Sequence, residues 1–428
     1  MLTQTPKQAP GEAATSRWSG YYAGYSTEFV RDALAFLDAN GKLGEGAIVL
    51  DPWNGSGTTT EVTHLRGIDA IGIDVNPAIV IVAKARLLRS DVKPSHLSIC
   101  TTVLRAARRF CENSVSPEDP LLWWFTPSAA TSLRGVERAI QHVLVPNAYR
   151  RITTVSMAEV SALAAAFYVA LFRATRSFLG RFGTSNPTWT KTAQTPSHRL
   201  RPSRQDVFDA FRACVARFFH GLDLPSASTR SGKTIVDVGD STSLPNHDGS
   251  VSAVIASPPY CTRIDYAVAT KPELAVLGVT SPEFDQLRRR MMGCPLISGT
   301  SPPMDEAWGS TCLEFLARVQ SHPSHGSRSY YFPTHADYYS QLHASFTEIA
   351  RVIREGGQAI FVVQDSYYKD VHNDLQAVTI EMLQRQRLQL IARRDHHLPI
   401  TKAAVNTRHK KYRTSCAAVE SVMVFEKN

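Results

Sequence analysis

The stretch Asp51-Pro52-Trp53-Asn54-Gly55-Ser56-Gly57-Thr58-Thr59 follows the apolar run 47–50 and combines two glycines with three hydroxyl side chains. A buried strand that turns into a helix in this way is typical of a parallel α/β sheet. The glycines allow backbone conformations closed to other residues and let a ligand approach the chain. The first turn of the following helix offers free N–H groups to an anion. The chain has no Gly-Lys-Ser/Thr ending here, which argues against a nucleotide P-loop.

A second strand, 70–73, ends at Asp74, which lies 23 residues after Asp51. A carboxylate at this place can accept hydrogen bonds from both hydroxyls of a ribose. The glycine-rich turn and Asp74 together predict a site for a nucleoside-containing cofactor.

Two more strands end in distinctive turns. Strand 234–238 leads into Gly239-Asp240-Ser241, and strand 251–256 leads into Ser257-Pro258-Pro259-Tyr260. Because the carboxyl ends of parallel strands meet at one edge of a sheet, these turns are expected beside the glycine-rich turn.

The remaining pattern predicts a doubly wound, mostly parallel α/β sheet of the Rossmann-like kind with an inserted helical subdomain. Helices are expected over 338–355, stopping at Gly356-Gly357, and over 375–388, with strands near 359–363, 390–392 and 421–425. The predicted parts are a flexible tail (1–16), a first core part (17–84), a mostly helical insertion (85–232) and a second core part (233–428) with a loop-rich excursion at 267–329.

Composition indicates an ordinary cytosolic protein. No run approaches the roughly 20 apolar residues that a membrane span needs, and residues 1–16 lack the apolar core of a secretory signal. The seven cysteines have no short paired spacing, so neither a disulfide framework nor a metal site is expected. The net charge of +9 fits a polyanionic partner without identifying one.

At its two principal turns the sequence resembles the amino-methyltransferase family of DNA methyltransferases, which use S-adenosylmethionine (SAM) to methylate N4 of cytosine or N6 of adenine. The resemblance covers about 21–83 and 234–265, and more loosely 338–365. It implies that Asp240 accepts a hydrogen bond from the adenine of SAM and that Tyr25 and Ser26 close over its methionine end; an ordinary turn aspartate and a helix N-cap are the alternatives. The implied SAM-binding residues are Tyr25, Ser26, Asp51, Trp53, Gly55, Ser56, Gly57, Thr58, Thr59, Asp74, Asp240 and Ser241, and the implied catalytic residues are Ser257, Pro258, Pro259 and Tyr260.

The chemistry of an exocyclic amino group explains the second motif. Its nitrogen lone pair is shared with the ring until acceptors hold the amino hydrogens in a tetrahedral arrangement. The Ser257 hydroxyl and the Pro258 carbonyl are the expected acceptors, since the prolines fix φ and carry no N–H. Tyr260 offers a ring on which a flipped base can stack. No Pro-Cys pair occurs, so methylation of cytosine C5 through a cysteine nucleophile is not indicated.

The substrate stays open among related alternatives. In the family that the sequence resembles, serine at the first motif position is commoner in cytosine-N4 enzymes, and aspartate or asparagine in adenine-N6 enzymes. An RNA base methyltransferase and a catalytically silent nucleic-acid-binding subunit remain alternatives. The long insertion precedes Gly239-Asp240 instead of following it, a departure from the family pattern that leaves the DNA-reading segment undecided.

Most of the excess positive charge lies in one region. Residues 151–230 contain eleven Lys and Arg against four Asp and Glu. Arg199, Arg201 and Arg204 are predicted to contact the phosphates of double-stranded DNA; a solvated loop is the alternative. The same two interpretations apply to the basic run 408–413. The run 123–125 (Trp-Trp-Phe) is expected in the core.

Overall fold

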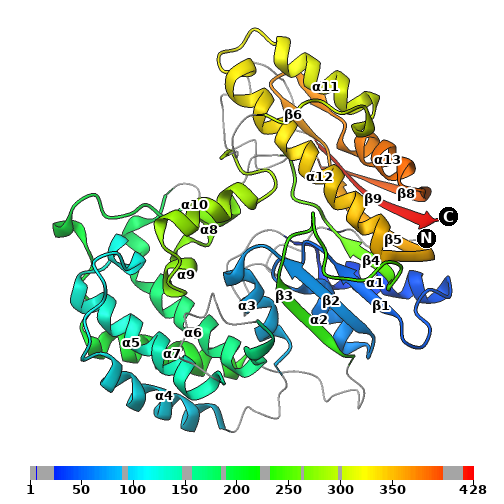
Figure 1. Cartoon of the computed structure of the whole chain (residues 1–428). Helices are drawn as coiled ribbons and strands as arrows, with labels where there is room; N and C mark the ends of the chain where they lie inside the picture. Colours follow the sequence, from blue (N-terminus) through cyan, green and yellow to red (C-terminus); the bar gives the residue numbers. More distant parts are fainter. Residues whose placement is uncertain are drawn as a thin grey trace.

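The computed structural model describes residues 6, 24–88, 95–146, 157–184, 189–221, 232–261, 265–296, 301–398 and 418–428. Its centre is a seven-stranded sheet of order β3-β2-β1-β4-β5-β9-β8 (Figure 1). The strands are β1 (Ile48–Asp51), β2 (Asp69–Asp74), β3 (Thr234–Val238), β4 (Val251–Ala256), β5 (Ile353–Gln364), β8 (Leu388–Leu398) and β9 (Ala418–Lys427).

The order of the strands defines where a ligand can bind. The pairings among β3, β2, β1, β4 and β5 are parallel, whereas β9 is antiparallel to both of its neighbours. From β1 the chain passes outward to β2 and β3, then returns to β4 on the other side of β1. The strand order therefore reverses between β1 and β4, and in open α/β sheets ligands bind beyond the carboxyl ends of the strands at such a point. The predicted doubly wound, mostly parallel sheet is confirmed.

Apolar side chains cover both faces of the sheet. On one face, helices α1 (Thr27–Ala39) and α2 (Thr58–Leu65) pack on Val49, Ile255 and Val362. On the other, Leu50, Val254 and Phe361 join the core formed by α11 (Ser310–Ser321), α12 (Phe332–Val352) and α13 (Leu375–Arg385). Adjacent residues Val49 and Leu50 thus point to opposite layers, as strand geometry requires.

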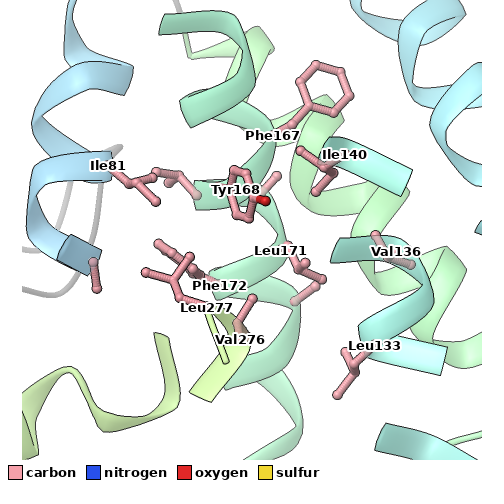
Figure 2. Close-up of a cluster of buried hydrophobic side chains, with 14 of the residues drawn as sticks. Ile81, Leu133, Val136, Ile140, Phe167, Tyr168, Leu171, Phe172, Val276 and Leu277 are labelled. Atoms are coloured by element: carbon pink, nitrogen blue, oxygen red, sulfur yellow. The ribbon is translucent and has the colours of Figure 1, made fainter. Parts of the chain in front are cut away.

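A separate helical lobe lies beside the sheet (left in Figure 1). Its helices are α4 (His96–Phe110), α5 (Pro127–Leu144), α6 (Ala162–Phe178), α7 (Arg204–His220), α8 (Tyr266–Ala269), α9 (Lys271–Val276) and α10 (Ser281–Arg290). Figure 2 shows where it joins the core: Ile81 of helix α3 (Pro77–Arg86) meets Tyr168 and Phe172 of α6 and Leu277 after α9. Helix α3 is apolar nearly all round because it is buried on nearly all sides.

The lobe is made from two stretches of chain, one before β3 and one after β4. Arg134 of α5 is buried and donates to the carbonyls of Ala275 (3.0 Å) and Val276 (2.5 Å). The same guanidinium pairs with Asp119 at 3.0 Å and Glu137 at 3.3 Å. Breaking such a buried pair leaves an uncompensated charge at a cost of about 3–5 kcal/mol, so this network holds the two stretches together.

Two sequence expectations need correction. The excursion 267–329 is not mainly loop, since α9, α10 and α11 lie within it. Helix α12 ends at Val352, not at Gly356-Gly357, and the glycines belong to β5, where Gly356 has φ of 67°.

The expected burial of the run 123–125 is confirmed. Trp124 and Phe125 are fully buried and Trp123 packs partly buried against the same core. Within the described part of the chain, no helix is long and apolar enough to cross a membrane.

Candidate cofactor and substrate site

The glycine-rich turn joins β1 to α2 at the point where the strand order reverses. Gly55 has φ of 49° and Gly57 has φ of 87°, in the left-handed region that favours glycine. A Cβ atom at Gly57 would also lie 2.7 Å from the Cβ of Ala83 on α3. Glycine at position 57 is therefore required both by the backbone conformation and by the close approach of α3.

The Asp51 side chain stabilises this turn through hydrogen bonds. Its carboxylate accepts hydrogen bonds from Thr59 Oγ1 (2.6 Å), the Tyr25 hydroxyl (3.0 Å) and the Trp53 amide (3.1 Å). Burial raises the pKa of Asp51 to about 6, against the opposing effect of these bonds. Asp51 and Thr59 are buried and hydrogen-bonded to each other, so their side chains stabilise the conformation of the turn.

Tyr25 and Ser26 join the amino end of α1 to the same turn. The Tyr25 hydroxyl, already bonded to Asp51, also contacts Thr59 Oγ1, and burial foremost raises its pKa well above the usual value. Ser26 caps α1 by accepting a hydrogen bond from the Phe29 amide at 3.1 Å. Both residues predicted to close over a cofactor are engaged in the fold, and the N-cap alternative describes the Ser26 side chain.

Asp74 lies beside the turn because β2 pairs with β1. Its carboxylate accepts hydrogen bonds from the amides of Gly55 (2.9 Å) and Asn76 (2.8 Å), one on each oxygen. Burial raises its pKa to about 6 although both bonds favour the ionised form. Each oxygen keeps further lone pairs, which suits the two hydroxyls of a diol.

Several polar atoms of the turn are not paired by the described residues. Trp53 places its ring edge-on to Phe346 of α12, with centroids 6.4 Å apart, and its buried indole N–H has no acceptor among those residues. The buried Asn54 amide nitrogen is likewise unpaired there. Ser56 is partly exposed, and the side chain of Thr58 accepts a bond from Arg86 at 3.1 Å. Buried polar groups without partners are uncommon, and this turn holds two of them, Trp53 Nε1 and Asn54 Nδ2, among the described residues.

Asp240 and Ser241 follow β3, the strand next to β2. One Asp240 oxygen accepts from the amide (3.0 Å) and hydroxyl (2.7 Å) of Thr242, which is the ordinary turn role weighed from the sequence. The other oxygen lies 3.6 Å from Arg290 Nε of α10. The Ser241 hydroxyl is buried against Ser345 of α12 at 2.8 Å.

The Ser257-Pro258-Pro259-Tyr260 turn follows β4, between the ends of β1 and β5. The Ser257 hydroxyl donates to the Val362 carbonyl at 3.0 Å, so its hydrogen is engaged while its oxygen can still accept. The Tyr338 hydroxyl donates to the Pro259 carbonyl at 2.9 Å, and no described residue donates to the Pro258 carbonyl. The Ser257 hydroxyl also interacts with the Tyr260 hydroxyl, which lowers the pKa of Tyr260 against the larger effect of burial.

Glu420 is a site residue that the sequence did not predict. It lies on β9, and one of its oxygens accepts the Tyr260 hydroxyl at 3.0 Å. Burial, followed by the charge of Glu420, raises the pKa of Tyr260 well above the usual value. Only the placement of β9 next to β5 brings Glu420 here, and no local motif marks it.

The three candidate DNA-contacting arginines lie on the helical lobe. Arg199 and Arg201 lie in the segment before α7 and Arg204 is its first residue; Arg201 and Arg204 are exposed and Arg199 is partly so. Leu200 fixes the segment by bonding Trp124 and Thr126 through its backbone, at 2.7 and 2.9 Å. None of the three arginines pairs with a carboxylate of the described residues. The basic run 408–413 lies outside the described residues.

Two other arginines of the basic region are neutralised within the protein. Arg176 pairs with Glu273 and Arg212 with Asp209. Asp209 is already included in the count for 151–230, whereas Glu273 lies outside that region and offsets one further positive charge.

Comparison with known proteins finds a relative in sequence and several solved structures that align at low TM-scores. The chain is 24% identical over 319 residues to the type II methyltransferase M.BsoBI of Geobacillus stearothermophilus, covering 67% of this chain and 57% of that protein. Solved structures with low TM-scores include a SAM-dependent methyltransferase from Methanosarcina mazei (TM-score 0.30, 10% identity, 91% of this chain and 96% of that one). Geranyl diphosphate methyltransferase in complex with SAM has a TM-score of 0.32 at 10% identity, over 93% of this chain and 85% of that one. No family model matches the sequence.

Proposed function

We propose that the protein is a SAM-dependent methyltransferase that transfers a methyl group to the exocyclic amino group of a base in DNA, with N4 of cytosine favoured. The proposal rests on three turns, after β1, β2 and β4, that lie together where the strand order of the sheet reverses. The glycine-rich turn with Asp74 forms one side, and Ser257-Pro258-Pro259-Tyr260 forms the other, on the adjacent strand β4. Similarity to a protein named as a type II methyltransferase supports the same conclusion.

The residues present fit SAM. Asp74 would hold the ribose hydroxyls, the turn 53–57 would approach the methionine part, and the Trp53 N–H offers an unused donor. The oxygen of Asp240 near Arg290 would face the adenine. When bound, SAM supplies a methyl group on a positively charged sulfur.

Ser257 and Pro258 would prepare the nucleophile. The Ser257 oxygen and the Pro258 carbonyl would accept the two amino hydrogens, which localises the lone pair on the nitrogen instead of the ring. When the nitrogen takes the methyl group, the bond between that carbon and the sulfonium sulfur would break to leave a neutral thioether, and one amino hydrogen would be lost as a proton. The Tyr260 ring, fixed at its hydroxyl by Glu420, offers a stacking face worth ~1–3 kcal/mol. This offsets part of the few kcal/mol that opening a base pair costs.

Cytosine is favoured because the motif begins with serine, and adenine N6 is the second candidate. The glycine-rich string Gly55-Ser56-Gly57-Thr58-Thr59 and the named relative favour DNA over RNA. A catalytically silent subunit would be expected to lose part of one motif, and both are intact in this chain.

The decisive experiment identifies the product. Unmethylated DNA is treated with the protein and methyl-labelled SAM, digested to nucleosides and analysed by mass. 2′-Deoxycytidine with the labelled methyl group on N4 is the expected product; 2′-deoxyadenosine labelled on N6 moves the assignment to the second candidate. Label that appears only in RNA offered in parallel, or SAM binding without any transfer, contradicts the proposal.

A further inference from the structure

A short β-hairpin stands against the Ser257–Tyr260 turn. It is formed by β6 (Ser366–Tyr368) and β7 (Val371–Asn373), and β6 begins two residues after β5 ends. Ser366 Oγ donates to the carbonyl of Cys261, the residue after Tyr260, at 3.3 Å. The hairpin therefore contacts the chain directly after the Ser257–Tyr260 turn.

The two faces of the hairpin have different roles. Tyr368, Val371 and Asn373 are buried, and the Tyr368 hydroxyl bonds Ser324 (2.8 Å) and Ser327 (2.5 Å). A two-stranded hairpin is marginal alone, so this inner face anchors it. Tyr367 and His372 form the outer face, opposite each other in register, with ring centroids 4.7 Å apart. About 40% of Tyr367 is exposed.

The two-residue tip of the hairpin carries Lys369, in an unfavourable backbone conformation, and Asp370, whose largely exposed carboxylate accepts from His322 at 2.8 Å. Lys369 has φ of 57°, one of two such non-glycine residues in the described chain, and strain of this kind persists where surrounding structure or function requires it. Its ammonium lies 5.9 Å from the centroid of the Tyr331 ring, which itself contacts the exposed Tyr330 at 5.1 Å. Tyr330 and Tyr367 are the two tyrosines among the large exposed apolar residues of the described chain. Tyr330 adjoins the Tyr331 ring, which packs on Tyr368 of the inner face, whereas Tyr367 lies on the outer face.

We propose that the hairpin 366–373 is a contact surface for duplex DNA, in which Tyr367 stacks on a base uncovered when the target base leaves the helix and Lys369 lies against a phosphate. The inference rests on the proposed function. Opening a base pair uncovers the faces of the neighbouring bases, and an aromatic ring within reach of the site recovers stacking without reading sequence. Rings beside a lysine suit a nucleic acid, whose base faces and phosphates alternate along the backbone.

The test uses an unmethylated duplex that contains the site on which the protein acts, and the same duplex with a mismatch opposite the target base. Tyr367→Ala should lower kcat/KM on the paired duplex by about 5- to 150-fold, the range expected for one stacked base. The deficit should shrink on the mismatched duplex, because a mismatched base leaves the helix more easily. SAM affinity should stay unchanged. Tyr367→Phe keeps the ring and should restore activity, and Ile391→Ala, an exposed apolar residue of β8, serves as the matched control.

Three results would overturn the proposal: full activity of Tyr367→Ala on the paired duplex, an equal deficit on both duplexes, or failure of Tyr367→Phe to restore activity. If the wild-type protein transfers no methyl group to any DNA, the proposed function fails on its own. Fluorescence anisotropy with a labelled duplex then decides the hairpin's role: weaker binding by Tyr367→Ala supports it, and unchanged binding overturns it.

Discussion

The side chain of Asn76 donates to Thr270 Oγ1 at 2.8 Å, and both residues are buried. Asn76 follows Asp74 by two residues and caps α3, whereas Thr270 lies between α8 and α9, beyond the Ser257–Tyr260 turn. This hydrogen bond thus joins the segment after Asp74, at the proposed cofactor site, to the segment that follows the Ser257–Tyr260 turn, at the proposed substrate site.

Thr270→Val should destabilise the protein by about 1–3 kcal/mol, because it keeps the shape of the side chain but leaves the Asn76 amide buried without its acceptor. Urea denaturation measures the change. Thr101→Val, at an exposed position of α4 where the hydroxyl bonds only its own helix, should stay within about 0.5 kcal/mol of wild type. Equal effects of the two substitutions would mean that the link carries no stability.

SAM binding should weaken as the pH falls through about 6, since the pKa of Asp74 is raised to about 6 by burial and only its ionised form accepts both ribose hydroxyls. A raised carboxyl pKa means that ionisation costs stability above pH 6 and that protonation removes this cost, so protonation of Asp74 does not itself unfold the protein. Titration calorimetry from pH 7.5 to 5, with thermal melting alongside, tests this. Asp74→Ala should abolish measurable SAM binding at pH 7.5 with the fold intact, and a trace like that of wild type would refute the assignment.

Tyr260→Ala should lower methyl transfer strongly while SAM affinity is nearly preserved, because the ring is expected to serve the base. Tyr260→Phe keeps the ring and removes the hydrogen bond to Glu420, so it should retain most of the activity. Steady-state kinetics and calorimetry on both variants provide the comparison. Matching losses of SAM binding and transfer in Tyr260→Ala would place the residue at the cofactor instead.

Neutralising Arg199, Arg201 and Arg204 together should weaken DNA binding and reduce the slope of log affinity against log salt by up to roughly 2.7, or about 0.9 for each phosphate contact. SAM affinity should not change. Arg212→Gln is the control on the same helix, because that arginine already pairs with Asp209. Wild-type affinity at every salt concentration would identify the arginine segment as solvated surface, whereas relaxed preference at one base pair would indicate base reading.

Gly57→Ala should destabilise the protein more than Gly41→Ala does. Both glycines have positive φ, 87° and 69°, so both substitutions introduce about 1–2 kcal/mol of strain. Only at position 57 would the new methyl group meet another residue, Ala83, since nothing lies within 4 Å at position 41. The difference between their unfolding free energies isolates this contact, and equal values would show that α3 adjusts without cost.

The sequence predicted the sheet and the turns of the candidate site because both rest on local patterns. Apolar runs ending at Asp51, Asp74 and Ser257 identify strands, and glycine pairs or prolines identify the turns. Residues such as Glu420 could not be found in this way. Its place beside Tyr260 follows from the antiparallel insertion of β9 between β5 and β8, which depends on packing of the whole sheet.

Errors in the sequence analysis had two physical causes. Helix α11 carries apolar Cys312, Phe315, Leu316 and Val319 at helical spacing, but serines, prolines and histidines on both sides concealed this short pattern. The pair Gly356-Gly357 predicts the end of a helix, but Ile353, three residues earlier, already pairs with Val251 of β4. Strand pairing therefore ends the helix before the glycines.

Because α9 completes the core of the helical lobe from a point beyond β4, the lobe is not a portable module. A fragment ending near residue 232 would lack Val276, Leu277 and the carbonyls that Arg134 needs, and would expose an apolar surface where they pack. During synthesis on the ribosome, more than forty residues must be added after α7 before α9 is available to complete the core of α4–α7. Exchange of this lobe between related proteins, in evolution or in the laboratory, therefore has to transfer two separate gene segments together.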